Sequence, residues 1–125
     1  MARILVIDDD ETLLLALQQV LAAAGHSVAT AQDGRQAEKL FRAEPFDLIL
    51  TDLVMPNREG LETVMLLHRE FPRLPVIAMS GGAVASKAYL DMAKKLGASR
   101  TLAKPFTPQA LHAAIAETLA SPAKE

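Results

Sequence analysis

Short apolar runs of strand length alternate along this chain with segments whose apolar residues recur at helical spacing. Strands are predicted at Arg3–Ile7, Ser27–Ala31, Asp47–Thr51, Pro75–Met79 and Arg100–Ala103. Helices are predicted at Glu11–Ala24, Arg35–Ala43, Leu61–Glu70, Val84–Leu96 and Pro108–Leu119. A repeated βα unit of this kind predicts an α/β fold with a parallel sheet and helices on both of its faces.

Residues with special backbone preferences fall between these elements, where they support the predicted boundaries. Gly25 and Gly97 follow helical runs, where a left-handed cap favours glycine. Asp33 and Thr107 are suited to cap the helices that follow them. The run Ser27–Ala31 alternates instead of being continuously apolar, so we expect it at an edge of the sheet.

Polar residues stand at or just past the carboxyl ends of four predicted strands: Asp8 with Asp9, Asp52, Ser80 and Lys104. These strand ends share one edge of a parallel sheet, so we expect the five side chains to converge. Crowded carboxylates repel one another unless they take up protons or bind a cation. Mg2+ prefers oxygen ligands, and the lysine and the hydroxyl could pair with a phosphoryl group. The pattern predicts a phosphoryl-transfer site.

Composition and charge narrow the class of protein. A chain of 125 residues suits one domain, predicted at residues 1–120 with a frayed tail at 121–125. The absence of cysteine excludes disulfides and thiolate chemistry, and it fits a reducing cytoplasm. A net charge of −2 without a basic cluster argues against direct nucleic-acid binding. No apolar run is long enough to span a membrane, so we expect a cytoplasmic protein.

Four segments, in order and each after a strand, resemble the receiver domain of two-component response regulators. They are Val6–Asp10, Asp52–Gly60, Ser80–Gly82 and Lys104–Phe106. The resemblance extends over about Ala2 to Ala120. It implies a flavodoxin-like (βα)5 doubly wound parallel sheet with strand order 2-1-3-4-5.

The same resemblance implies a role for each site residue. Asp52 would accept a phosphoryl group from a sensor histidine kinase or a histidine phosphotransfer protein. Lys104 and Ser80 would bind phosphoryl oxygens. They would thereby couple phosphorylation to a change of surface around the fourth helix and the fifth strand. A downstream protein target, which the sequence does not identify, would recognise that change. Asp9, Asp52 and the Val54 backbone carbonyl would bind Mg2+ directly, and Asp8 would hold a water molecule bound to the metal. Many relatives carry Tyr or Phe three residues before the lysine, where this chain has Thr101.

Several alternatives remain open at this stage. Asp10 and Glu11 are best explained as a helix cap and a first-turn acid. An aspartate-nucleophile phosphohydrolase would also use Asp, Lys and Mg2+, but it usually has a second acid where this chain has Val54. A flavodoxin-like cofactor binder is disfavoured because Asp8–Asp10 would repel a phosphate. Two alternatives remain. One is a pseudo-receiver that serves only to bind other proteins, and the other is a receiver module cut from a larger response regulator or hybrid kinase.

Overall fold

The computed structural model describes residues 2–53, 59–81 and 87–120. Its strands are β1 (Arg3–Ile7), β2 (Ser27–Ala31), β3 (Leu48–Asp52), β4 (Val76–Ser80) and β5 (Arg100–Ala103). Its helices are α1 (Glu11–Ala23), α2 (Gly34–Ala43), α3 (Glu59–Glu70), α4 (Lys87–Leu96) and α5 (Pro108–Ala120). No helix in these described ranges is both long enough and apolar enough to cross a membrane.

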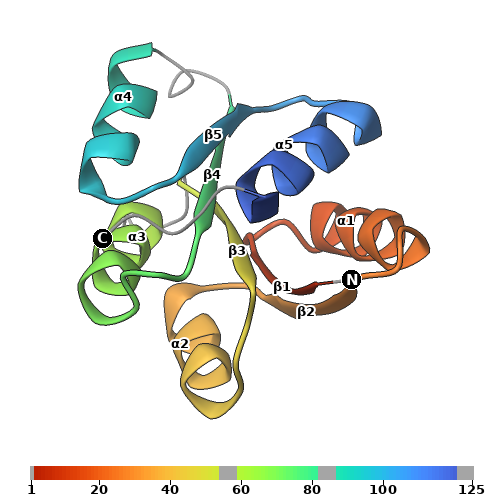
Figure 1. The fold of residues 1–125 in the computed structure, drawn as a ribbon, viewed down its shortest axis with the longest axis horizontal. Coiled ribbons are helices and arrows are strands. Elements are labelled where there is room, and N and C mark those ends of the chain that lie inside the picture. The colour runs from red at the N-terminus through yellow and green to blue at the C-terminus, as the bar shows by residue number, and fades with distance from the viewer. Residues whose placement is uncertain (1, 54–58, 82–86, 121–125) are drawn as a thin grey trace.

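The five strands form one parallel sheet in the order β2-β1-β3-β4-β5, which confirms the predicted flavodoxin-like fold (Figure 1). β1 lies between β2 and β3, so the chain crosses over β1 when it passes from β2 to β3. The alternating segment Ser27–Ala31 lies at the sheet edge, as predicted from its pattern. The continuously apolar strands β1, β3 and β4 lie inside the sheet.

Helices cover both faces of the sheet, with α1 and α5 on one face and α2, α3 and α4 on the other (Figure 1). Successive strand residues therefore enter two different cores. Leu5 and Ile7 of β1 pack in the core beneath α2, α3 and α4. Ile4 and Val6 pack in the core beneath α1 and α5. Strands buried on both faces are expected to be apolar at every position, which explains the Ile4–Ile7 run.

Local capping fixes the helix ends close to their predicted positions. Asp10 caps α1 by accepting hydrogen bonds from the Thr12 and Leu13 N–H groups, and Asp33 caps α2 in the same manner. The backbone φ angles of Gly25 and Gly97 are 96° and 131°. The predicted left-handed caps are therefore present. Of the predicted helix Val84–Leu96, residues 84–86 lie outside the described residues.

Two predicted strands are each displaced by one residue at both ends. The strands predicted as Asp47–Thr51 and Pro75–Met79 are observed as Leu48–Asp52 and Val76–Ser80. The cause is the ladder itself: Asp52 lies opposite Met79 on β4, and Ser80 lies opposite Ala103 on β5. Asp52 and Ser80 thus have their backbones fixed by strand pairing, which holds both side chains at the carboxyl edge of the sheet.

Candidate functional site

The site begins with four strand ends at one edge of the sheet. Asp8 directly follows β1, and its N–H donates to the Ala31 carbonyl at 3.0 Å. Asp52 and Ser80 are the last residues of β3 and β4. Lys104 directly follows β5, and its N–H donates to the Ser80 carbonyl at 2.6 Å. Parallel pairing therefore aligns residues that lie far apart in the sequence.

An ion-pair cluster joins three of these residues. Lys104 Nζ lies 2.7 Å from Asp8 Oδ2 and 3.4 Å from Asp52 Oδ2. Both carboxylates are almost completely buried, whereas the lysine side chain keeps 23% of its surface exposed. Burial by itself lowers the pKa of Lys104, but its hydrogen bond to Asp8 and the charges of Asp52 and Asp8 outweigh that effect. The pKa of Lys104 is therefore raised, and the ammonium stays charged at neutral pH.

The two carboxylates paired with this lysine form a cluster with a third, that of Asp9. Asp8, Asp9 and Asp52 each offer an oxygen, and these oxygens all lie within 4.8 Å of one another. Asp9 is exposed to solvent. The second oxygen of Asp8, Oδ1, accepts a hydrogen bond from the Asp10 N–H at 2.9 Å, which orients that carboxylate. Three negative charges face one ammonium, so the cluster keeps a negative excess that suits a hard divalent cation such as Mg2+.

Ser80 is buried at the carboxyl end of β4. Its hydroxyl oxygen has no hydrogen-bond partner among the described residues. A buried hydroxyl without a partner costs roughly 1–3 kcal/mol relative to a satisfied one, so it calls for an explanation. A group that arrives at the site and accepts a hydrogen bond from this hydroxyl would provide one.

Gly81 is the residue whose part in the site was not foreseen from the sequence. A Cβ atom at Gly81 would come within 3.0 Å of Lys104 Cβ. The absence of a side chain at position 81 therefore leaves room for Lys104 to reach across toward Asp8. Only the three-dimensional structure shows that the close neighbour of Gly81 is the lysine.

The sequence also singled out Thr101 and Val54, and the structure describes only the first of them. Thr101 is half-buried in β5, opposite Ala78 of β4. Val54, whose backbone carbonyl was expected to bind the metal, lies outside the described residues.

An open and mostly apolar hollow of about 490 Å³ lies beside the lysine. It is lined by Leu13, Gly81, Lys104, Pro105 and Phe106. A partner protein that approached this edge would meet both polar and apolar surface.

Comparisons with known proteins agree with this fold. The family model of the response regulator receiver domain matches residues 4–116. The chain belongs to the response regulator receiver domain family.

Its relatives include the alkaline phosphatase synthesis transcriptional regulatory protein PhoP of Bacillus subtilis. The two are 32% identical over 113 residues, which cover 90% of this chain and 46% of PhoP. The transcriptional regulatory protein ZraR of Escherichia coli is 37% identical over 117 residues, which cover 94% of this chain and 26% of ZraR. The chain thus spans less than half the length of these two relatives.

Solved structures show the same architecture. A response regulator receiver domain from Clostridium thermocellum superposes with a TM-score of 0.88 at 30% identity, covering 95% of this chain and 94% of that one. The Vibrio cholerae chemotaxis protein CheY4 gives a TM-score of 0.87 at 29% identity, covering 94% of this chain and 98% of that one. Nearly the whole of this chain therefore corresponds to a complete receiver domain.

Proposed function

We propose that this protein is a phosphoacceptor switch in which Asp52 receives a phosphoryl group from a phosphohistidine. The observation that carries the proposal is the position of Asp52, whose buried carboxylate ends β3 with the Lys104 ammonium 3.4 Å away. Membership of the receiver family supports it, because response regulators interact with histidine kinases. The donor would be a sensor histidine kinase or a histidine phosphotransfer protein.

The transfer needs little covalent chemistry from the protein. A carboxylate oxygen of Asp52 attacks phosphorus, a P–O bond forms, and the P–N bond to the donor histidine breaks. The departing imidazole nitrogen keeps the electron pair and takes up a proton. Lys104 already lies beside Asp52, so its positive charge is in place for the phosphoryl oxygens. The role is that of a phosphorylated regulatory domain rather than of an enzyme acting on a small substrate.

The acidic cluster fits a requirement for Mg2+. Asp8, Asp9 and Asp52 would hold the ion, together with the Val54 backbone carbonyl that the family resemblance implies. When bound, Mg2+ supplies positive charge that offsets the carboxylates and the incoming phosphoryl oxygens. Asp8 keeps its orientation through the Asp10 N–H, and Lys104 bridges Asp8 and Asp52.

Ser80 connects phosphorylation to a change of surface in this proposal. Its hydroxyl, which has no hydrogen-bond partner in the described part of the chain, would donate to a phosphoryl oxygen on Asp52, and β4 would carry that displacement toward α4 and β5. Thr101 of β5 has no aromatic ring that could turn inward. We therefore expect the change to be transmitted through the backbone near Ser80, and to be recognised by a downstream protein target rather than directly by nucleic acid.

Phosphorylation by a small donor tests the assignment. Acetyl phosphate with Mg2+ should add one phosphoryl group to the wild-type protein, measured as intact mass. Asp52→Asn should gain none, because its amide is a poor nucleophile. Asp91→Asn, a change of an exposed aspartate on α4, should be labelled like the wild type. Labelling of Asp52→Asn to the wild-type level would overturn the proposal.

A further inference from the structure

The outer edge of β2 carries backbone groups that point away from the sheet. The Ser27 N–H donates to the Ala2 carbonyl, and the Ala31 carbonyl accepts from Asp8, so Ser27 and Ala31 face β1. In a parallel ladder the N–H and C=O of one residue point to the same side, and this side alternates along the strand. Val28 and Thr30 therefore direct their N–H and C=O groups outward. β2 is the terminal strand of the sheet that the described residues form.

This open stretch is closed at both ends. Beyond Thr30, the Gln32 N–H donates to the side-chain oxygen of Gln36 at 2.6 Å. Before Val28, the His26 N–H donates to the Leu21 carbonyl at the end of α1, at 3.1 Å. The open edge thus consists of two residues, Val28 and Thr30, placed symmetrically about Ala29.

The β2 edge lacks several of the features that usually keep sheet edges apart. Edge strands are commonly protected by being very short, by charged side chains, by proline or by a bulge, and β2 has the short length. The sequence of β2 is Ser-Val-Ala-Thr-Ala, which contains neither a charge nor a proline. The opposite edge differs, because β5 carries Arg100, which forms an ion pair with Glu117 of α5 at 3.2 Å. Strand pairing is therefore less obstructed at β2 than at β5.

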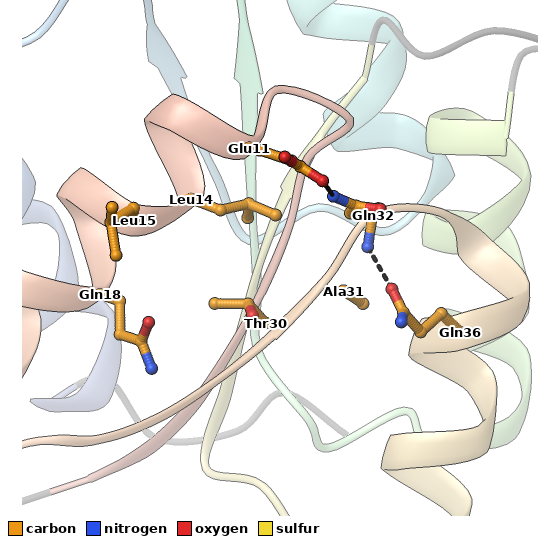
Figure 2. A pocket seen from close by; sticks show the side chains of 8 residues that line it. All are labelled: Glu11, Leu14, Leu15, Gln18, Thr30, Ala31, Gln32 and Gln36. Carbon is orange, nitrogen blue, oxygen red and sulfur yellow. Dashed lines mark hydrogen bonds between the residues drawn. The ribbon is translucent and has the colours of Figure 1, made fainter.

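A groove runs beside this edge between α1 and the carboxyl end of β2. Figure 2 shows Leu15 and Gln18 of α1 on one side, Gln32 with Gln36 on the other, and Thr30 in between. Its volume is about 400 Å³. Leu15, which lines this groove, is 57% exposed. The Gln32 side-chain amide donates a hydrogen bond to the Glu11 carboxylate at 2.5 Å, which fixes the position of this charge.

We propose that the β2 edge is an interface for a second copy of this chain, formed by antiparallel pairing of β2 with β2. With Ala29 facing Ala29 of the second copy, Val28 of each copy lies opposite Thr30 of the other. Each such pair can exchange two backbone hydrogen bonds, so four bonds use all the outward groups of Val28 and Thr30. The hydrogen bonds of Gln32 and His26 limit the pairing to this length.

The geometry selects a second copy because the edge is complementary to itself. A two-fold axis midway between the two Ala29 residues relates the copies, and it places Val28 of each copy opposite Thr30 of the other, as an isologous interface requires. No charged residue of β2 is placed opposite a like charge, because the strand has none. The same axis puts α1 of both copies on one face of the joined sheet, where each Leu15 side chain and groove can be covered by the other copy.

Association and its location can be tested together. Sedimentation velocity over a concentration series should show a reversible dimer of the wild-type protein. Thr30→Pro removes one outward N–H per copy and no bond to β1, and proline is tolerated at an outward edge position. It should raise the dimer dissociation constant by about tenfold or more. Thr30→Val keeps the N–H, so it should leave the constant unchanged.

A second variant covers the case in which Thr30→Pro fails to fold. Leu15→Lys alters an exposed side chain beside the seam and should also weaken the dimer, through repulsion between the two lysines. Met65→Lys makes the same kind of change at an exposed position of α3 and should have no effect. Hydrogen exchange supplies the location, because the amides of Val28 and Thr30 should become protected as concentration rises.

A protein that stays monomeric over the whole series overturns the proposal. So does a dimer that Leu15→Lys and Thr30→Pro leave unchanged, or one in which the Val28 and Thr30 amides exchange as fast as in the monomer.

Discussion

Lys104 lies nearer to Asp8 than to Asp52, with its ammonium 2.7 Å from Asp8 Oδ2 and 3.4 Å from Asp52 Oδ2. The lysine thus serves as the counter-charge of two buried carboxylates at once. Its direct hydrogen bond goes to Asp8, which leaves the weaker contact at Asp52, the residue proposed to accept the phosphoryl group. The lysine position therefore links the stability of the domain to the chemistry of the site.

Removing the lysine charge should destabilise the protein in the absence of Mg2+. Lys104→Met leaves Asp8 and Asp52 buried without their cation, and we expect a loss of about 1–3 kcal/mol in the free energy of unfolding. That range is below the usual figure for breaking a buried pair, because the lysine is partly exposed. Lys95→Met on the exposed surface of α4 is the control, expected to change stability by less than about 0.5 kcal/mol. Urea unfolding measures both, and equal effects of the two changes would contradict the ion-pair account.

Mg2+ should stabilise the folded protein through the three carboxylates. At a free concentration about ten times the dissociation constant, binding to the folded state alone adds about 1.4 kcal/mol, equivalent to a few degrees in melting temperature. Asp9→Asn removes one of the proposed ligands at an exposed position and should reduce this shift. Asp33→Asn, which preserves the cap of α2, should retain it in full. An equal Mg2+ shift in Asp9→Asn and wild type would exclude Asp9 as a ligand.

Ser80 should be nearly dispensable for the stability of the unphosphorylated protein. Ser80→Ala removes a buried hydroxyl that has no partner among the described residues, so we expect an unchanged or slightly higher free energy of unfolding. Thr118→Val is the matched control, because the buried Thr118 hydroxyl donates to the Ala114 carbonyl at 2.7 Å and should cost about 1 kcal/mol when lost.

The same Ser80→Ala variant should accept a phosphoryl group yet show smaller NMR shift changes in α4 and at Thr101 on phosphorylation. A large loss of stability in the unphosphorylated variant, or shift changes as large as in the wild type, would argue against the proposed role.

Gly81 should matter for phosphorylation more than for folding. In Gly81→Ala the new methyl group would meet Lys104 Cβ at 3.0 Å, so Lys104 must give way by a few tenths of an ångström, and we expect this to disturb its ammonium beside Asp8 and Asp52. We expect a several-fold slower reaction with acetyl phosphate, since a loss of about 1 kcal/mol in the transition state corresponds to roughly fivefold in rate. Thermal unfolding measured in parallel separates this effect from general destabilisation. If Gly81→Ala reacted with acetyl phosphate at the wild-type rate, the result would show that the lysine tolerates the methyl group.

Much of the fold followed from the sequence because its patterns are local. The continuous Ile4–Ile7 run identified an inner strand, and the alternating Ser27–Ala31 run identified an edge strand. Asp10 and Asp33 were suited to cap helices, and each does so through its own side chain. Convergence at the carboxyl edge followed from parallel pairing alone.

Other features depend on contacts between distant residues, which no local pattern specifies. The extension of β3 and β4 to Asp52 and Ser80 results from pairing with neighbouring strands. The approach of Gly81 to Lys104 depends on how β4 and β5 lie together, and so does the lack of a hydrogen-bond partner for the Ser80 hydroxyl among the residues that the structure describes. The exposure of Leu15 depends on where α1 ends up relative to the sheet edge.

The most direct test of the central claim is chemical identification of the phosphorylated residue. Borohydride reduces an aspartyl phosphate to homoserine, which tandem mass spectrometry locates in a peptide. After phosphorylation with Mg2+, homoserine should appear at Asp52 and at no other acidic residue, in proportion to the phosphoryl group gained by the intact protein. Homoserine at Asp8 or Asp9 in place of Asp52, or phosphorylated protein without homoserine at Asp52, would contradict the account.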